Sequence, residues 1–152
     1  MPEFRHRFTL KAPLEAVIAF HQQPQALARL TPPPLCLEIL YHEPLGEGSR
    51  LRFRLSLGLF SIFWEAIHRE VDFRQGFTDE QVQGPLKFWR HRHTFIPLDA
   101  NHTVVEDQIR YTYRPGWRHL WTRVIFSPLG LRFLFTYRQH ALARALAHRG
   151  TP

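Results

Sequence analysis

From Leu35 onward, the spacing of apolar residues changes once, and the change falls at Pro115-Gly116. Before that point, apolar and polar residues alternate in one short segment after another, which is the period of strands that bury one face. After it, apolar residues recur every three or four positions over 128–149, which predicts one long amphipathic helix. The chain therefore combines a sheet with a helix whose apolar stripe needs a large partner.

Seven strands and two short helices are expected ahead of the long helix. Pro13 and Pro24 each open a short helical segment, and the second segment ends at the Pro32-Pro33-Pro34 block, because a residue before proline avoids the helical conformation. Turns rich in Gly, Pro, Asn and Asp separate the later strands, a spacing typical of an antiparallel meander. The expected helices are residues 13–21 and 24–30, and the expected strands are residues 4–10, 37–41, 51–57, 62–73, 77–82, 87–96 and 103–113.

The long helix is expected to cover the sheet, because no other large apolar surface is available to it. A chain of 152 residues suits one α+β domain spanning residues 1–152, without a linker or an internal repeat. The single cysteine, Cys36, has no disulfide partner within the chain. No secretory signal pattern and no apolar run of about 20 residues is present, so we expect a cytoplasmic protein.

The chain carries 20 Lys and Arg residues against 13 Asp and Glu residues, a formal net charge of +7 at pH 7. Such a balance can indicate a partner rich in phosphate groups. Yet the basic residues are spread along the chain, and strand alternation places a set of them on outward faces: Arg50, Arg52, Arg54, Arg90 and Arg92. We interpret the charge as mainly that of a solvated sheet exterior, which disfavours nucleic acid and leaves at most a peripheral contact with a membrane.

Several motifs resemble those of one known superfamily. They are Ala12-Pro13-x-Glu15, the segment Phe77-x-Asp79-x-Gln81-x-x-Gly84-Pro85-x-x-x-Trp89-x-His91-x-His93-x-Phe95, and Phe135-x-Tyr137-Arg138. With them, the chain resembles the START-like superfamily, also called SRPBCC, and within it a small bacterial ligand-binding branch described as polyketide cyclase/dehydrase-like. The resemblance implies a helix-grip fold, in which a curved antiparallel sheet wraps around the C-terminal helix and encloses an apolar cavity. Relatives of this fold carry lipids, hormones or polyketides, and some catalyse cyclisation and dehydration, so the fold alone does not select a chemistry.

Two neighbouring strands place polar side chains on their inward faces. Alternation in residues 87–96 puts His91 and His93 on the face opposite the arginines, and Asp107 shares a face with apolar residues in the last strand. A buried carboxylate needs a donor, so we expect Asp107 to pair with one of these histidines or with Arg138. Such a cluster is either structural or in contact with a ligand.

From these features, we expect the protein to bind a hydrophobic small molecule or lipid, with transport or sequestration of that ligand as its role. We expect a monomer or a homodimer. The inward face of residues 62–73 is left open, because Trp64, Ala66 and His68 compete with Phe63, Ile67 and Val71. Apolar side chains would supply affinity, and the few polar ones would supply orientation. The expected ligand-binding residues are Phe53, Leu55, Trp64, Phe77, Trp89, His91, His93, Tyr111, Leu134 and Arg138.

Two other classes of function stay open. In a cyclase or dehydratase, a histidine paired with Asp107 would remove a proton next to a carbonyl, and Tyr111 or Arg138 would stabilise the enolate. The catalytic candidates are His91, Asp107 and Tyr111. In a basic binding module, the segment 117–123, rich in Trp and Arg, would contact bases or anionic lipid; the same segment could instead act as a lid. No metal and no cofactor is expected, because His91 and His93 lack a third ligand.

Overall fold

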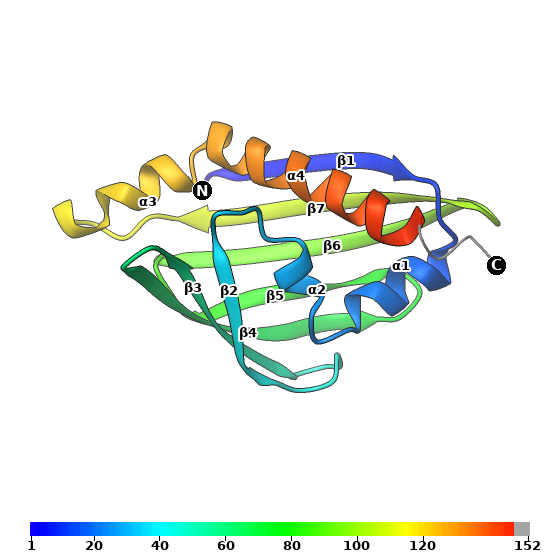
Figure 1. The fold of residues 1–152 in the computed structure, drawn as a ribbon, viewed down its shortest axis with the longest axis horizontal. Coiled ribbons are helices and arrows are strands. Elements are labelled where there is room, and N and C mark those ends of the chain that lie inside the picture. Colours follow the sequence, from blue (N-terminus) through cyan, green and yellow to red (C-terminus); the bar gives the residue numbers. More distant parts are fainter. Residues whose placement is uncertain (148–152) are drawn as a thin grey trace.

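The computed structural model describes residues 1–147, which form one curved antiparallel sheet packed against helices (Figure 1). The strand order is β1-β7-β6-β5-β4-β3-β2. The strands are β1 (Glu3–Leu10), β2 (Cys36–His42), β3 (Arg50–Leu57), β4 (Phe60–Asp72), β5 (Gly76–Gln83), β6 (Phe88–Asp99) and β7 (His102–Thr112). The helices are α1 (Leu14–His21), α2 (Ala26–Arg29), α3 (Leu120–Ile125) and α4 (Pro128–Ala147), with a 3-10 turn, η1 (Trp117–His119), before α3.

The helix-grip architecture predicted from the sequence is confirmed. The two short helices follow the first strand, six strands form the meander, and α4 crosses the face of the sheet made by β1, β7 and β6 (Figure 1). The expected end of the long helix, Arg149, lies outside the described residues. The connection ahead of α4 contains η1 and α3, which the apolar spacing did not predict.

Helix α4 contributes to both halves of the core. Near its start, Leu131 and Phe135 pack in a cluster with residues of β3, β4, β6 and β7. Near its end, Leu142 and Leu146 pack in a second cluster with α1 and with the other ends of β6 and β7. The apolar stripe of the helix is therefore buried along its length, as its spacing predicted.

A bulge near the end of β4 decides which of its side chains face the core. Glu70 has a φ of 51°, and the pairing of β4 with β5 shifts between Arg69 and Asp72. Before the bulge, Trp64, Ala66 and His68 are buried. After it, Val71 packs against the core, because one extra residue reverses the alternation of side chains. The choice left open by the sequence is thus resolved in favour of Trp64.

The outward arginines of β3 and β6 are mostly paired with carboxylates. This corrects our interpretation of the net positive charge as that of the sheet exterior. Glu65 pairs with Arg50 and Arg52, and Arg90 pairs with both Glu70 and Glu80. The last acidic residue in the sequence is Asp107. Residues 1–107 hold 12 basic and 13 acidic residues, a net charge of −1, whereas residues 108–152 hold eight arginines and no acidic residue. The excess positive charge therefore belongs to the C-terminal segment and not to the sheet exterior.

Within the described residues, no helix combines the length and apolarity that a membrane-spanning segment requires.

Two phenylalanines on α4 test the role of this helix. Phe135 is 1% exposed between the helix and the sheet, whereas Phe133 is 69% exposed. Phe135→Ala should lower the free energy of unfolding by about 3–5 kcal/mol, because it leaves a cavity in the core. Phe133→Ala, the matched control, should change it by less than about 0.5 kcal/mol in urea unfolding. Equal effects of the two substitutions would contradict the packing described here.

Candidate functional site

A cavity of about 90 Å³, measured as the space open to the centre of a water molecule, lies between the sheet, the α1–α2 segment and α4. Its apolar wall includes Leu27, Leu30 and Phe77, and its polar wall includes Asp79 and His93. The remaining lining residues are His21, Gln23, Pro24, Ala26, His42, Leu45, Leu51, His68 and Arg138. The site thus offers apolar surface on one side and ionisable groups on the other.

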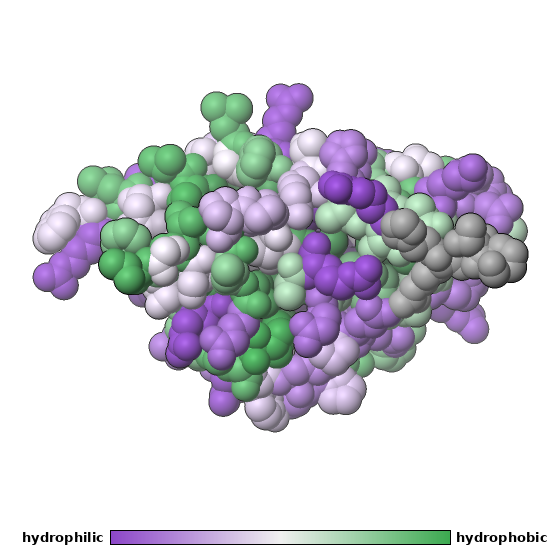
Figure 2. Space-filling model, viewed as in Figure 1, coloured by the Kyte–Doolittle hydropathy of each residue, from purple (hydrophilic) through white to green (hydrophobic). Residues whose placement is uncertain are grey.

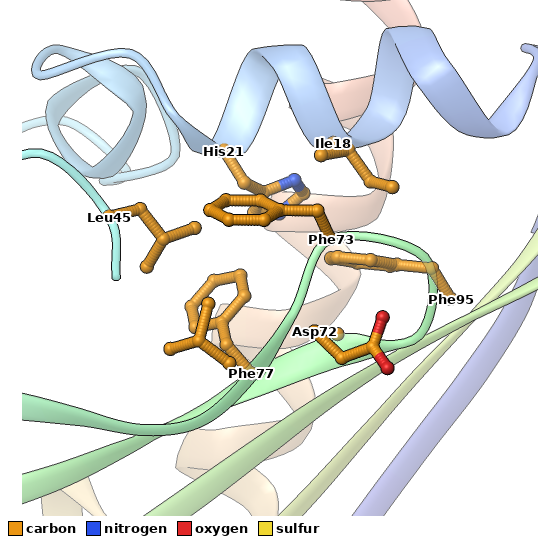
Figure 3. A pocket seen from close by; sticks show the side chains of 9 residues that line it. Ile18, His21, Leu45, Asp72, Phe73, Phe77 and Phe95 are labelled. Carbon is orange, nitrogen blue, oxygen red and sulfur yellow. The ribbon is translucent and has the colours of Figure 1, made fainter. Parts of the chain in front are cut away.

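A smaller hollow of about 10 Å³ lies beside this cavity, beneath α1 (Figure 3). His21 and the rings of Phe77 and Phe95 line it. The space is about that of one water molecule, so it adds little room for a ligand. His21 lines both spaces, and its Nδ1 lies 2.8 Å from the carbonyl oxygen of Val17.

The polar wall belongs to a continuous row of hydrogen bonds and ion pairs across β4, β5, β6 and β7. His68 Nε2 lies 3.0 Å from Asp79 Oδ1, and Asp79 Oδ2 lies 2.9 Å from His93 Nε2. On its other side, His93 Nδ1 lies 3.1 Å from Asp107 Oδ1, and the same oxygen accepts from His91 Nε2 at 2.8 Å. Every ring nitrogen in the row that meets a carboxylate is a donor.

The row begins at Ser49, in the turn before β3. Its hydroxyl accepts a hydrogen bond from the backbone N–H of Gly46 at 3.1 Å and lies 2.8 Å from His68 Nδ1. His68 Nε2 faces Asp79, so Nδ1 is the ring nitrogen that meets the hydroxyl. The turn before β3 therefore holds the orientation of His68.

Strand register explains why these side chains meet. His68 stands opposite Asp79, and His93 stands opposite Asp107, in the antiparallel pairs β4–β5 and β6–β7. In the antiparallel pair β5–β6, Asp79 stands opposite His91. Residues that face each other across antiparallel strands place their side chains on the same side of the sheet. Alternation along each strand then turns all of them toward the interior.

The two carboxylates give neighbouring histidines opposite protonation states. Burial alone would lower the pKa of His93, but the hydrogen bonds to Asp107 and Asp79 raise it to about 9. Burial, together with repulsion from the charged His93, lowers the pKa of His91 to about 4 in spite of its bond to Asp107. At neutral pH, His93 is therefore a cation between two anions, and His91 is neutral.

The carboxylates themselves stay ionised. Burial opposes their charge, yet hydrogen bonds from His68 and His93 hold the pKa of Asp79 well below its usual range. Hydrogen bonds from His91 and His93 likewise lower the pKa of Asp107. Both oxyanions are thus already satisfied and are weak bases.

Arg138 of α4 differs from the other polar residues of the cavity in lacking a partner for one donor. Among the described residues, its Nε is the one buried side-chain nitrogen or oxygen without a hydrogen bond. Its guanidinium carbon lies 5.1 Å from the centre of the Phe135 ring. Burial lowers the pKa of Arg138, and the charges of Asp107 and Asp79 oppose this. A buried donor without an acceptor is costly, so this nitrogen is suited to meet an oxygen from a bound molecule.

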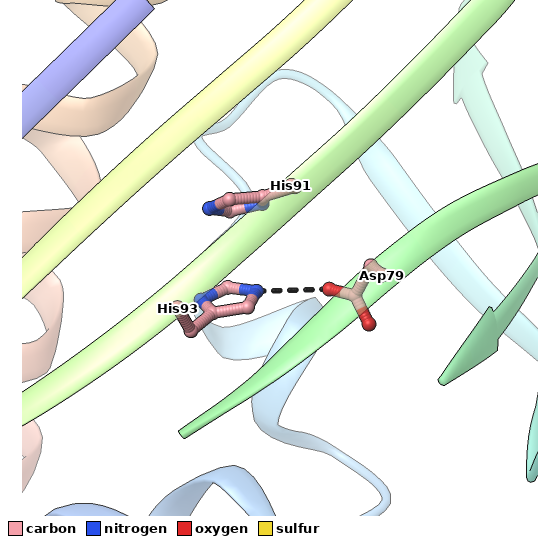
Figure 4. Close-up of side chains that lie close together, drawn as sticks. All are labelled: Asp79, His91 and His93. Atoms are coloured by element: carbon pink, nitrogen blue, oxygen red, sulfur yellow. Dashed lines mark hydrogen bonds and ion pairs between the residues drawn. The ribbon is translucent and has the colours of Figure 1, made fainter. Parts of the chain in front are cut away.

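The third ligand that the sequence did not place beside His91 and His93 is Asp79, and one atom of each residue lies within 4.8 Å of the others. The rings of the two histidines lie one over the other, with centroids 3.7 Å apart and planes at 37° (Figure 4). A metal ion must lie close to the plane of each imidazole ring, and stacked rings do not direct their lone pairs to one point. Both nitrogens of His93 are also engaged with carboxylates. The arrangement fits a shared proton network and not a metal centre.

The structure separates the expected ligand-binding residues into groups. Phe77, His93 and Arg138 line the cavity. His91 lies beside them, bonded to Asp107. A second group fills the core cluster around Leu131 and Phe135 and lines no part of this cavity: Phe53, Trp64, Trp89, Tyr111 and Leu134. Leu55 is half-buried, opposite Ile62 on β4, outside both core clusters.

The three catalytic candidates are placed unequally. His91 and Asp107 are in direct contact, but neither lines the cavity. Tyr111 is 2% exposed, and burial raises its pKa to about 12. Sequence reasoning missed Asp79, His68 and the α2 side chains as parts of the site. Alternation from Phe77 places Asp79 inward, and this signal could have found it.

Comparisons with known proteins agree with this architecture. A family model described as "Polyketide cyclase / dehydrase and lipid transport" matches residues 10–125. The Zhui aromatase/cyclase from Streptomyces sp. R1128 is similar in structure, with a TM-score of 0.78 at 16% identity, over 99% of this chain and 96% of that one. No curated protein matches the chain in sequence.

Two further solved structures share the fold. Norcoclaurine synthase from Thalictrum flavum, in complex with dopamine and hydroxybenzaldehyde, has a TM-score of 0.69 at 15% identity, over 99% of this chain and 89% of that one. A START superfamily protein from Mycobacterium smegmatis has a TM-score of 0.71 at 14% identity, over 96% and 97% of the two chains. At these identities the likeness shows the fold and no specific chemistry.

The opposite pKa shifts of His93 and His91 predict that the free energy of unfolding is highest near pH 6.5. The folded state keeps the His93 proton up to about pH 9, so this stabilisation is complete below pH 6.5 and is lost as the pH rises through 9. His91 and His21, both with a pKa of about 4, stay neutral when folded, so stability also falls as the pH drops from 6.5 toward 4. Urea unfolding between pH 4 and pH 10 measures both limbs.

The variant His93→Gln separates the two limbs. It should remove the decline between pH 6.5 and pH 9, whatever its effect on overall stability. The acid decline should become smaller but persist, because burial still lowers the pKa of His91 and His21 when the charge of His93 is gone. A wild-type free energy of unfolding that stays constant between pH 6.5 and pH 9 would contradict the charge state assigned to His93.

Proposed function

The chain belongs to the polyketide cyclase/dehydrase and lipid transport family, and from this premise we propose that it binds a small apolar molecule carrying an oxygen acceptor in the cavity between the sheet, α1–α2 and α4. The observation that carries the proposal is the unpartnered Nε of Arg138, in the wall of a cavity that combines apolar side chains with ionisable groups. Of the residues predicted from the sequence, Phe77, His93 and Arg138 contact the ligand in this proposal.

The apolar wall supplies the affinity. Side chains of Leu27, Leu30, Leu51 and Phe77 meet in the cavity from α2, β3 and β5. A ligand that covers them removes their surface from water, at about 25 cal/mol per Å² of apolar area. Small-molecule sites generally combine such a wall with a few polar groups that fix orientation.

The polar wall directs the oxygen of the ligand to Arg138. Both nitrogens of His93 already donate to carboxylates, so its ring has no free donor for a ligand. His68 is similarly engaged by Ser49 and Asp79. The Nε–H of Arg138 is free, and its positive charge favours an acceptor that is itself charged. A carboxylate on an apolar body is the ligand class that satisfies all these conditions.

The second candidate is a cyclase or dehydratase activity, favoured by the ionisable groups in the cavity wall. Their charge states make proton abstraction difficult, because His93 is protonated at neutral pH and the ionised Asp79 is a weak base. In this candidate, Arg138 polarises a carbonyl group through its free Nε–H. Liquid chromatography with mass spectrometry of a bound compound before and after incubation distinguishes the two functions, since a carrier leaves the compound unchanged, cyclisation alters its retention and dehydration removes the mass of one water.

Filling the cavity tests the binding proposal. Leu27→Trp places a larger ring in the space and should abolish binding of apolar carboxylates, from cinnamate to medium-chain fatty acids, in isothermal titration calorimetry. Gln25→Trp, on the exposed side of the same segment, is the matched control and should bind as the wild type does. Unchanged binding by Leu27→Trp would place the site elsewhere.

Replacing the arginine tests the class of ligand. Arg138→Met should weaken binding of a carboxylate about tenfold to a hundredfold, since a hydrogen bond to a charged group contributes roughly 1.5–3 kcal/mol. Binding of the corresponding hydrocarbon should change little, because the methionine side chain keeps the apolar stem. An equal loss for both compounds would show that Arg138 acts through packing alone.

A further inference from the structure

An exposed apolar surface covers η1, α3 and the start of α4 and has no role in the cavity. Trp117 is 77% exposed, Val124 is 72% exposed and Leu129 is 78% exposed. Figure 2 shows apolar side chains gathered over α3 and the first part of α4. We call this surface the α3 patch; its apolar members are Trp117, Leu120, Trp121, Val124, Ile125, Leu129 and Phe133.

The α3 patch is the outer side of an anchored segment. On the opposite side of α3, Thr122 is fully buried and Phe126 belongs to the core cluster with Trp64 and Trp89. The hydroxyl of Tyr113 donates to the carbonyl oxygen of Phe126 at 2.8 Å. The outward positions Trp121 and Val124 lie three residues apart in α3, so they share one face of this helix, and Trp117 precedes them in η1. An exposed apolar face on a segment that is itself packed against the core is typical of an interaction site.

Positive charge accompanies the apolar side chains. Arg114, Arg118, Arg123 and Arg132 are exposed in and around the patch. Within residues 1–147, none of them forms an ion pair, in contrast to the outward arginines of β3 and β6. The chain has no acidic residue after Asp107, so no carboxylate of this segment can neutralise them. The patch therefore joins apolar surface to unbalanced positive charge.

We propose that the α3 patch docks on the surface of a membrane that contains anionic phospholipids. Tryptophan is favoured at the boundary between headgroups and acyl chains, and aliphatic side chains beside it enter the acyl region. Arginines at the rim meet lipid phosphates, and each basic residue near an anionic surface adds about fivefold in affinity.

Two other partners fit the same surface less well. A nucleic acid would satisfy the arginines and stack on tryptophan, but it would leave Val124, Leu129 and Phe133 against water or phosphate. A second copy of the chain would cover the apolar side chains but would bring two sets of unbalanced arginines together. An anionic bilayer satisfies both components at once.

Docking through the α3 patch is independent of the cavity. No lining residue of the cavity comes from residues 114–133. The segment 117–123 is therefore not the cavity lid that the sequence also allowed. A variant that loses membrane binding should keep ligand binding, and Leu27→Trp should keep membrane binding. Failure of one proposal is thereby distinguishable from failure of the other.

Co-sedimentation with vesicles tests the proposal. The wild type should bind vesicles of phosphatidylcholine with 30% phosphatidylglycerol more than about tenfold tighter than vesicles of phosphatidylcholine alone, and added salt should weaken the binding. The double variant Arg118→Gln/Arg123→Gln should lose about 25-fold in affinity for the anionic vesicles. The double variant Val124→Ser/Leu129→Ser should also lose at least tenfold, since both side chains leave the acyl region.

Matched controls lie at the opposite end of the sheet. Leu98 is 58% exposed near the β6–β7 turn, and Arg74 is exposed in the β4–β5 turn. Leu98→Ser and Arg74→Gln remove the same kinds of group and should bind anionic vesicles as the wild type does. Equal losses in the controls would show that binding is non-specific, which overturns the proposal.

Three further results would overturn it. One is equal affinity, or no affinity, for the two kinds of vesicle. Another is a wild-type dimer, in sedimentation velocity, that Val124→Ser/Leu129→Ser converts to a monomer without any vesicle binding, which would make the patch an interface between copies. A third is displacement of the vesicles by a short DNA duplex whose binding depends on the same arginines and on Val124 and Leu129.

Discussion

The interior of this protein depends on one buried cation, the ring of His93, held between the carboxylates of Asp79 and Asp107. Each of these three charges would be costly alone, but together they satisfy one another in a small space. The ring joins β5 to β6 and β7, and Asp79 extends the connection to His68 on β4. Four strands are thus fixed in register by side chains as well as by their backbone bonds, and the wall of the cavity is rigid where it is polar.

This network also limits what the site can do. Its donors are committed to carboxylates and its carboxylates to histidines, so the groups that look most reactive in the sequence are saturated in the structure. Among residues 1–147, the buried side-chain donor left without a partner is Nε of Arg138, on α4. In the proposed function, the helix therefore recognises the ligand, while the sheet provides a polar wall whose donors and acceptors are already engaged.

Local patterns predicted most of the fold, because alternation and helical spacing report directly which faces are buried. They also brought His91, His93 and Asp107 together correctly, since these residues lie on adjacent strands. Asp79 and His68 belong to more distant strands, and their meeting depends on register and on the bulge at Glu70, which no local pattern reports. The cavity likewise depends on where α2 rests on the sheet. For this reason Trp89 and Tyr111, inward as expected, lie in a filled part of the core.

The absence of acidic residues after Asp107 has a consequence for how the molecule moves in an electric field. The first 107 residues are nearly neutral, while the helical C-terminal segment carries the excess charge along one side of the sheet (Figure 1). Such a separation gives the protein a large dipole moment, and a field that decays over about 8–10 Å in physiological salt exerts a torque on it before contact. We therefore expect the chain to turn α3 and α4 toward an anionic surface before it touches that surface.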